Sequence, residues 1–291
     1  MKNQIVIGID VGGSHITAGI VDLEARKLQE KRLMRCPVDS KGEEKMILEQ
    51  WCEAIVPLVP ELGLESLRLG IAMPGPFDYD AGISFIGSTQ DKYEALYGKN
   101  IKELLASKLG IKTSQIRFKN DAACFLQGEL FAGSAQGFKR AIGMTLGTGA
   151  GTAFFHGTEA HDAARWGDSF KEGIAEQYFS SRWFLQKYHE LTGKEIIGVR
   201  DLAELEDLPL KTAIFTEFGQ NLGLFLSRFA SEEEAEVVVL GGSITHSSDL
   251  FMAEVKSQVA RECGNVSIRK SLLGEQAALI GAASCWYESI S

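Results

Sequence analysis

The chain has 291 residues, of which 45% are hydrophobic and 24% charged, and its formal net charge is −9 at pH 7. This length allows two domains or one large α/β unit, and the acidic balance disfavours nucleic acid and anionic membrane as partners. The charge does not exclude a phosphate ligand, because backbone amides and Mg²⁺ attract phosphate locally.

The apolar runs and the cysteines bear on localisation. No apolar run approaches the length of a membrane-spanning helix, and the N-terminus enters a strand without the pattern of a signal peptide. The five cysteines are scattered and include no C-x-x-C pair, which favours reduced thiols. We therefore expect a cytoplasmic protein.

The opening stretch, residues 5–22, consists of two apolar runs joined by a small polar turn. This alternation predicts a β-hairpin with Gly12 and Gly13 at the bend, where glycine accepts positive φ without steric cost. Backbone N–H groups of such a turn can bind phosphate oxygens. Asp10 ends the first strand beside this turn, and a carboxylate next to a phosphate needs a hard cation such as Mg²⁺ between them. An ordinary hairpin with a surface aspartate is the alternative.

The rest of the chain alternates predicted strands and helices. Short apolar runs predict strands at residues 28–36, 67–73, 116–119, 141–146, 153–155 and 237–240. Helical spacing predicts helices at residues 43–56, 100–109, 122–131, 174–188, 211–229 and 275–286. The helix at 122–131 is rich in small residues, which implies close packing against another element. The glutamates at 232–234 are interpreted as a solvated charge run.

A second glycine-rich turn, at residues 147–152, lies between two predicted strands as the first one does. This repeated pattern of strand, glycine-rich turn and strand indicates two copies of a βββαβα unit rather than a solenoid. No linker is visible in the composition, so we place the domain boundary near Lys119. The expected domains are a smaller N-terminal one, residues 1–119, joined by the C-terminal helix region 275–291, and a larger one, residues 120–274.

A third glycine turn, Gly241-Gly242-Ser243, follows the apolar run at 237–240. None of the three turns is a Walker P-loop or a Rossmann turn, because neither G-x-x-x-x-G-K-[ST] nor G-x-G-x-x-G occurs. Each turn alone is a weak signal, since glycine often follows a strand. Together with the repeat, they favour a nucleotide held between two similar domains.

The order of these motifs resembles the ROK family of sugar kinases, within the sugar kinase, Hsp70 and actin superfamily, over most of the chain. Residues 10–14 and 145–149 are similar to the family's two phosphate motifs, and residues 239–243 to its adenosine motif. Residues 70–78 resemble the sugar-side loop, and residues 120–123 the catalytic motif. The resemblance implies an α/β fold of two actin-like, or ribonuclease H-like, domains with a cleft between them.

The resemblance also implies that ATP is the phosphoryl donor and that Mg²⁺ reaches Asp10 through phosphate or water. It assigns ATP binding to the three turns and their flanks, namely Asp10, Gly12, Gly13, Ser14, His15, Thr17, Gly147, Thr148, Gly149, Gly241, Gly242 and Ser243. The implied partner is a small sugar, and a homodimer is the expected assembly.

The resemblance assigns Asp121 as general base, and the chemistry agrees. A sugar hydroxyl must lose its proton as it attacks the γ-phosphoryl group, and a positioned carboxylate accepts that proton. Asn120, Asp121, Pro74 and Gly75 are implied to contact the sugar. Asn120 and Asp121 also suit a helix N-cap. We expect both roles, a cap that also reaches the substrate.

One stretch departs from the family pattern. ROK kinases usually carry Glu-x-Gly-His and then a cysteine cluster that supplies a structural zinc site, but this chain has no cysteine between Cys124 and Cys263. We therefore expect no zinc, because a tetrahedral Cys₃His site cannot form. Residues 165–168, Arg-Trp-Gly-Asp, stand in place of Glu-x-Gly-His when the chain is aligned on residues 173–176.

Two alignments of this stretch stay open. In the first, Arg165 and Trp166 pack within a loop, or Arg165 recognises an anionic or unusual substrate. In a shifted register, Glu159 and His161 take the sugar-binding roles, although His161 also fits an exposed loop histidine. Glu176 keeps its sugar-binding role in the shifted register as well.

These inferences favour an ATP- and Mg²⁺-dependent kinase of a hexose-like sugar, with glucose as the default substrate and N-acetylated hexosamines next. Two alternatives stay open. A sugar- and DNA-binding regulator of the same family needs a DNA-binding module before the first strand, which we do not expect because that strand starts near the N-terminus and the net charge is acidic. A catalytically weak or inactive protein that binds sugar or nucleotide fits the altered Glu-x-Gly-His pattern, but it has no need of Asp121 as a base.

Overall fold

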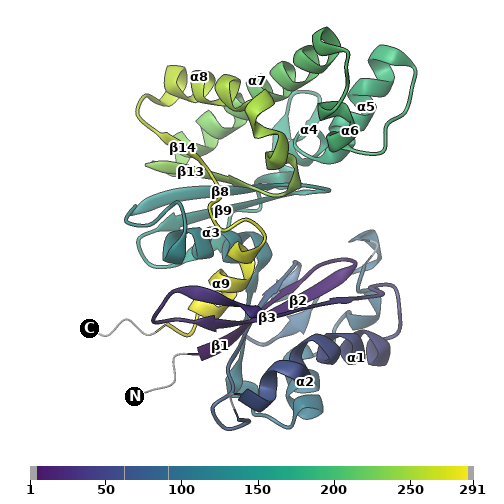
Figure 1. Ribbon diagram of the computed structural model, residues 1–291, viewed down its shortest axis with the longest axis vertical. Coiled ribbons are helices and arrows are strands. Elements are labelled where there is room, and N and C mark those ends of the chain that lie inside the picture. The colour runs from purple at the N-terminus through teal and green to yellow at the C-terminus, as the bar shows by residue number, and fades with distance from the viewer. Residues whose placement is uncertain (1–4, 62, 91, 288–291) are drawn as a thin grey trace. The chain divides into compact units, whose positions relative to one another are not determined.

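The computed structural model describes residues 5–61, 63–90 and 92–287 of the chain (Figure 1). Its contacts divide the chain into two compact units. Unit 1 comprises Met1–Gly133 together with Glu275–Ser291, and unit 2 comprises Ser134–Gly274. The division lies C-terminal to the expected boundary near Lys119, because the helix that follows Lys119 packs within unit 1.

Unit 1 is built on a five-stranded sheet with the order β3-β2-β1-β4-β7. Its strands are β1 (Ile5–Val11), β2 (His15–Asp22), β3 (Lys27–Pro37), β4 (Leu69–Met73) and β7 (Ile116–Asn120). β1, β2 and β3 pair antiparallel, which confirms the predicted opening hairpin, whereas β4 and β7 extend the sheet in parallel with β1. The parallel arrangement brings the carboxyl ends of β1, β4 and β7 to one edge of the sheet.

The helices of unit 1 are α1 (Glu44–Ile55), α2 (Ile101–Leu109), α3 (Asp121–Ala132) and α9 (Gln276–Ser284). Shorter elements are η1 (Val56–Glu61), β5 (Phe77–Asp78), β6 (Ile83–Ser84), η2 (Ser88–Gln90), η3 (Glu94–Leu96) and η4 (Thr113–Gln115). Ile47 and Trp51 on α1 join Ile7 and Ile9 of the sheet in one buried apolar cluster. This core fixes the sheet edge that carries the predicted catalytic residues.

Helices α3 and α9 pack so closely that their contact requires glycine. A Cβ atom on Gly128 would overlap the carbonyl oxygen of Ala277, and one on Gly281 would overlap that of Cys124. Any larger residue at these positions would force the two helices apart. The predicted close packing of the small-residue helix is therefore confirmed, and its partner is α9, coloured yellow in Figure 1.

Unit 2 repeats the sheet of unit 1. Its strand order is β10-β9-β8-β13-β14, with two antiparallel and two parallel pairs in the same sequence as in unit 1. The strands are β8 (Arg140–Leu146), β9 (Ala150–His156), β10 (Ala160–Asp162), β13 (Val237–Gly241) and β14 (Ser267–Lys270), with a small ribbon of β11 (Ser169–Phe170) and β12 (Gly173–Ile174). The predicted duplication is confirmed.

The helical part of unit 2 covers an aromatic core. Its elements are η5 (Arg165–Gly167), α4 (Ala175–Tyr178), α5 (Ser181–Thr192), α6 (Val199–Ala203), α7 (Leu208–Glu232), η6 (Ser243–Leu250) and α8 (Met252–Cys263). The helix predicted at 174–188 is split, because Ser180 is extended (φ −116°, ψ 166°) and separates α4 from α5. The rings of Phe179, Phe184 and Phe218 are fully buried between these helices.

The described helices and the cysteines give two further observations. No helix among the described residues is long and apolar enough to cross a membrane. The five cysteines, all within the described part of the chain, form no disulfide there. Cys124 is buried between α3 and α9, and burial raises the pKa of its thiol well above the ordinary value.

Candidate active site

The carboxyl ends of three neighbouring strands in unit 1 bring the predicted catalytic residues together. In the register of the sheet, Asp10 on β1 lies beside Ala72 on β4, and the next β4 residue, Met73, lies beside Asn120 on β7. Asp121 follows Asn120 directly. Asp10 and Asp121 therefore lie at the same edge of the sheet, where ligands of parallel sheets bind.

Asp10 is a partly buried carboxylate without a partner. Within the described residues, its side chain makes no hydrogen bond or ion pair. Burial, followed by the negative charges of Asp121 and Glu275, raises the pKa of Asp10 from 3.8 to about 7, against a lowering effect of Arg35. Two carboxylates that repel each other at one site favour a bound cation.

Asp121 occupies the first position of α3, after Asn120 as the N-cap. Asn120 Oδ1 accepts the N–H of Ala123 at 3.0 Å, and Asp121 Oδ1 accepts the N–H of Ala122 at 2.8 Å. Burial raises the pKa of Asp121, while the Ala122 N–H and the charge of Lys92 lower it. A carboxylate with a raised pKa is a better proton acceptor near neutral pH.

The sugar-side loop is tied to Asn120 through a tyrosine that the sequence analysis missed. Asn120 Nδ2 donates to the hydroxyl of Tyr79 at 3.3 Å, and that hydroxyl donates to the carbonyl oxygen of Met73 at 3.2 Å. Pro74 is buried and Gly75 is half-buried directly after Met73. Tyr79 stands one residue beyond the loop motif at 70–78, and an aromatic residue beside a sugar-side loop is the signal that could have identified it.

The first phosphate turn has a different geometry from the predicted one. Neither Gly12 nor Gly13 has positive φ, so the predicted reason for glycine is wrong. Instead, the Gly12 N–H donates to the carbonyl oxygen of His15 at 2.9 Å, and a Cβ atom on Gly12 would lie only 3.0 Å from that oxygen. Gly13, Ser14 and His15 are exposed, so the turn can be reached from solvent.

Thr17 lies opposite Asp10 in the β1–β2 ladder and is half-buried. Its hydroxyl is thus on the strand next to the unpaired carboxylate. Ser14 Oγ and His15 Nδ1 are 3.0 Å apart at the tip of the turn. The predicted phosphate-binding residues of unit 1 are therefore contiguous with Asp10.

A loop between the sugar-side and phosphate motifs was also missed. We call Ser88–Gln90 and Lys92–Leu96 the bridging loop. Gln90 Nε2 donates to the carbonyl oxygen of Gly75 at 3.3 Å, and the Tyr93 hydroxyl donates to that of Gly12 at 2.5 Å. Tyr93 is fully buried, which raises the pKa of its hydroxyl. The loop has no hydrophobic period, so periodicity gave no signal for it.

In unit 2, the two remaining glycine turns adjoin each other at the ends of β8 and β13. Gly242 has φ +85°, and a Cβ atom there would overlap the carbonyl oxygen of Leu146. A Cβ atom on Gly147 would lie 3.8 Å from Ser243 Oγ. The N–H of Ser181, at the start of α5, donates to the Gly147 carbonyl oxygen at 2.7 Å. The predicted second phosphate turn and adenosine turn thus form one glycine-lined surface.

Glu176 lies next to this surface. One of its carboxylate oxygens would be 3.4 Å from a Cβ atom on Gly149, and the other accepts from Arg182 Nη2 at 2.5 Å. Arg182, on α5, is exposed and was not singled out from the sequence. The predicted sugar-binding carboxylate is therefore paired with an arginine.

Arg165 is occupied by an internal ion network. Its guanidinium donates to Glu232, to Glu233 at 3.0 Å and to Asp168 at 3.4 Å, and it lies 4.5 Å from the Phe229 ring centroid. Only 17% of its side chain is exposed. The interpretation of residues 232–234 as merely solvated was wrong, because two of these glutamates bind Arg165. The contacts support the packing interpretation of Arg165 over substrate recognition.

Glu159 and His161 lie at the exposed edge of the second sheet. His161 is on β10, 3.9 Å from Glu159, and its ring lies 5.5 Å from that of Phe154. Neither the contact between His161 and Glu159 nor that between His161 and Phe154 involves Glu176. The shifted register therefore receives no support from a shared cluster.

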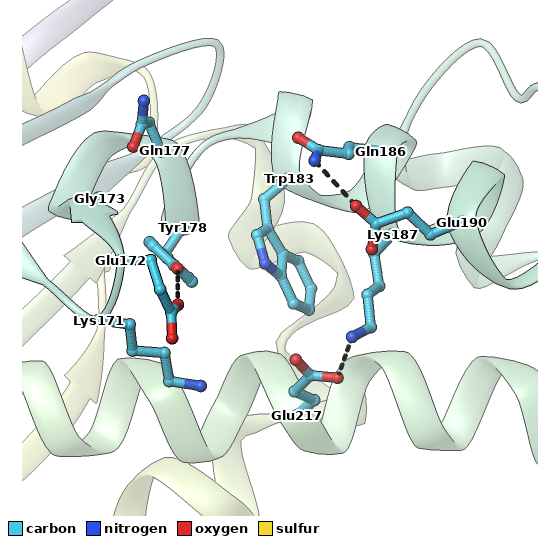
Figure 2. A pocket seen from close by; sticks show the side chains of 10 residues that line it. All are labelled: Lys171, Glu172, Gly173, Gln177, Tyr178, Trp183, Gln186, Lys187, Glu190 and Glu217. Atoms are coloured by element: carbon cyan, nitrogen blue, oxygen red, sulfur yellow. Dashed lines mark hydrogen bonds and ion pairs between the residues drawn. The ribbon is translucent and has the colours of Figure 1, made fainter.

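A cavity of about 460 Å³ lies elsewhere in unit 2 (Figure 2). It is lined by side chains of α4, α5 and α7 and the segment before them, namely Lys171, Glu172, Gly173, Gln177, Tyr178, Trp183, Gln186, Lys187, Glu190 and Glu217. Its polar groups pair with one another: Lys187 with Glu217 at 2.7 Å, and Tyr178 with Glu172 at 2.9 Å. None of the predicted site residues lines it. In the described chain, no group of three or more histidine, cysteine, aspartate or glutamate residues is arranged to hold a metal ion.

The sequence is similar to a known protein family and to curated proteins over nearly its whole length. The ROK family profile matches residues 6–166 and 171–289. The chain is 23% identical to N-acetyl-D-glucosamine kinase of Haemophilus influenzae, over 95% of this chain and 97% of that protein. It is 24% identical to glucokinase of Thermotoga maritima, over 100% and 99%.

A solved structure gives the same fold. The ROK family glucokinase from Streptomyces griseus, in complex with glucose and AMPPNP, superposes with a TM-score of 0.76 at 22% identity, covering 97% of this chain and 98% of that one. This likeness and the two repeated sheets confirm the predicted fold class of two actin-like units. With the profile matched over nearly its whole length, the chain belongs to the ROK family.

Proposed function

We propose that this chain is a carbohydrate kinase that transfers the γ-phosphoryl group of ATP to a hydroxyl of a hexose-like sugar, with Mg²⁺ as cofactor. The observation that carries the proposal is the pair of partly buried carboxylates, Asp10 and Asp121, with raised pKa values at one sheet edge. The Asp10 carboxylate is suited to bind a cation, and the Asp121 carboxylate is suited to accept a proton. The relatives named glucokinase and N-acetyl-D-glucosamine kinase support the same activity.

Asp121 is the general base in this proposal. The sugar hydroxyl oxygen attacks the γ-phosphorus, the bond from that phosphorus to the β,γ-bridging oxygen breaks, and ADP leaves. The hydroxyl proton passes to the Asp121 carboxylate, whose raised pKa makes it a stronger acceptor. Asn120, fixed by Ala123 and Tyr79, orients the start of the helix that carries the base.

Mg²⁺ fits the carboxylate of Asp10. That carboxylate has no partner within the described residues, and Mg²⁺ prefers hard oxygen ligands. Mg²⁺ usually binds through one or two carboxylates together with waters and substrate phosphates, so the proposal requires no larger cluster of protein ligands. When bound, the cation neutralises charge on the phosphoryl oxygens.

The glycine turns suit a nucleotide. The exposed turn after β1 offers backbone N–H groups to phosphate oxygens, and the adjoining turns after β8 and β13 admit close approach of a ligand. We infer that closure around the bound sugar excludes the water that would hydrolyse ATP. Sugar and a non-hydrolysable ATP analogue together should make the particle more compact in small-angle scattering, and unchanged dimensions would contradict closure.

Glucose is the first proposed substrate and an N-acetylated hexosamine the second, following the names of the relatives. Glu176 is the proposed carboxylate for a sugar hydroxyl. Because Arg182 already binds Glu176 at 2.5 Å, a sugar hydroxyl must share that carboxylate with the guanidinium.

The direct test is ATP consumption in a coupled assay across hexoses and N-acetylated hexosamines, with and without Mg²⁺. One sugar should raise ATP turnover well above the sugar-free rate, and chelation of Mg²⁺ should abolish that increase. A panel in which no sugar stimulates ATP turnover contradicts the kinase. Sugar or nucleotide binding by calorimetry would then identify an inactive binding protein.

The purified protein offers further checks. Elemental analysis should find no stoichiometric zinc, because the sequence lacks the cysteine cluster between Cys124 and Cys263. About one zinc per chain would contradict our alignment at residues 165–168. We also propose a homodimer, which light scattering after size exclusion tests, and a cytoplasmic location.

A further inference from the structure

The bridging loop connects the two parts of the unit 1 site. Gln90 donates to Gly75 in the sugar-side loop, and the buried Tyr93 donates to Gly12 in the phosphate turn. The Tyr93 N–H also donates to the Ser40 carbonyl oxygen at 2.6 Å. With an anchor on either side of it, the position of Lys92 is set by the turn and the sugar-side loop.

Lys92 lies against the phosphate turn. A Cβ atom on Gly13 would be 3.7 Å from Lys92 Cδ, which is ordinary van der Waals contact. The side chain is half-buried, and its ammonium makes no hydrogen bond or ion pair within the described residues. Its charge reaches Asp121, where it lowers the pKa of the carboxylate. Lys92 thus lies near both the phosphate turn and the base.

This placement suits an anion that arrives with the substrate. An ammonium offers three hydrogen-bond donors, and those of Lys92 are unused in the described protein. The neighbouring Gly13 turn is exposed and offers backbone N–H groups to the same ligand. The negative charge of Asp121 attracts the Lys92 ammonium toward the point where the sugar hydroxyl would attack.

We propose that Lys92 is a further catalytic residue, whose ammonium contacts the oxygens of the phosphoryl group as it passes from ATP to the sugar. The proposal rests on the kinase function proposed above. In phosphoryl transfer, charge spreads over the three equatorial oxygens of the transferred group, and a preorganised cation stabilises that charge. The proton of the sugar hydroxyl goes to Asp121.

The first test measures binding, so that it does not depend on turnover. With glucose or N-acetylglucosamine present, wild type should bind a non-hydrolysable ATP analogue more tightly than ADP, because Lys92 contacts the terminal phosphoryl group. Lys92→Met should lose affinity for the analogue by about tenfold or more and leave ADP affinity nearly unchanged. Lys99→Met is the matched control, since Lys99 instead pairs with Glu44 at 3.0 Å on the surface of unit 1.

The second test measures rates. Lys92→Met should lower kcat by about 10²–10³-fold, with sugar affinity and melting temperature close to wild type. Lys92→Arg should recover part of the loss, because a guanidinium also donates to phosphoryl oxygens. If Lys92 acts only through Asp121, its removal raises the pKa of that carboxylate, and the rate returns to wild type at high pH. Such a recovery would overturn the contact with the phosphoryl group.

The two tests separate the two proposals. A selective loss of affinity for the ATP analogue supports the contact of Lys92 with the phosphoryl group, even if no sugar in the panel is phosphorylated. In that case only the proposed kinase function fails. Equal changes in ATP-analogue and ADP affinity, or no change in either, overturn the role of Lys92 while leaving sugar phosphorylation standing. A wild-type protein that binds no nucleotide overturns both.

Discussion

The two sheets have the same topology but different chemistry at equivalent positions. β1 and β8 are both seven residues long, and their sixth residues are Asp10 and Thr145. Thr145 Oγ1 accepts the N–H of Gly151 at 3.2 Å across its own hairpin. Asp10 has no such partner within the described chain. At these equivalent positions, the Thr145 side chain of unit 2 is hydrogen-bonded, whereas the Asp10 carboxylate of unit 1 is unpaired within the described chain.

The difference shows what duplication provides. Both copies supply a glycine turn after the first strand, closed by Gly12 N–H to His15 in one and Gly147 N–H to Gly149 in the other. Both turns are therefore suited to phosphate. The residues with raised pKa values at a strand end, Asp10 and Asp121, occur in unit 1. The repeated turns supply the proposed phosphate binding, and side chains at the carboxyl ends of one sheet supply the proposed chemistry.

The largest contrast is expected between Asp10→Asn and Thr145→Val. Loss of the Asp10 charge should lower turnover by about 10²–10³-fold and weaken the dependence on Mg²⁺. Thr145→Val should cost about 1 kcal/mol of stability through the lost hydrogen bond and change turnover by less than about fivefold. Turnover and Mg²⁺ titrations on both variants check this. Equal losses of turnover would contradict the division between the units.

The Asp10→Asn variant should also change how stability depends on pH, in a direction set by the raised pKa of Asp10. The folded pKa of about 7 exceeds the ordinary 3.8, so between these values the folded chain holds more protons than the unfolded chain. Stability from this group is therefore present at low pH and falls as pH rises toward 7. Asp10→Asn removes the penalty, so its melting temperature should rise relative to wild type as pH increases from 5 to 8. Exposed Asp80→Asn is the control, and a constant difference would refute the buried charge.

A medium effect is expected from a methyl group on either phosphate turn. Gly13 and Gly149 both lack positive φ, and a Cβ atom on either meets nothing closer than 3.4 Å. Alanine should therefore fold at both positions but intrude on the ligand, raising the KM for ATP about tenfold, or ~1.4 kcal/mol. Gly198→Ala, where a Cβ atom meets open space, is the control. An increase at one turn alone would mean that only this turn contacts the nucleotide.

The smallest effect is expected at Arg165, a charged residue of unit 2 for which we propose no catalytic role. Arg165→Met should cost about 1–3 kcal/mol through the loss of the ion network and the Phe229 contact, and should leave sugar affinity unchanged. Arg228→Met, whose side chain is 58% exposed, should cost less than about 1 kcal/mol. Thermal unfolding and sugar titration decide between the two roles. Unchanged stability with lost sugar binding would revive substrate recognition by Arg165.

The sequence predicted what depends on short-range pattern. The hairpins, the three glycine turns and the cap at Asn120 lie within a few residues, so spacing and residue type indicated them. The duplicated sheet followed from the repeat of the same local pattern. The split at Ser180 was missed because the apolar spacing continues through it, although its extended backbone ends α4.

Contacts between distant segments could not be predicted in the same way. Tyr93 reaches Gly12 across 81 positions of the chain, and Arg165 reaches Glu232 across 67. Nothing periodic marks either partner, because each pairing exists only in the folded chain. The glutamates at 232–234 were therefore interpreted as solvated, and no role was assigned to the bridging loop. The turn at Gly12 and Gly13 was predicted correctly, but neither glycine has the positive φ that was given as its reason.

The central claim is that Asp121 of unit 1 takes the proton from the sugar hydroxyl. The most direct measurement is the turnover of Asp121→Asn on the best sugar, with its melting temperature and sugar affinity measured alongside. Asparagine keeps the shape at the start of α3 but cannot accept the proton, so turnover should fall about 10²–10⁴-fold while melting temperature and sugar affinity stay near wild type. Full turnover in this variant would contradict the account and remove Asp121 from the mechanism.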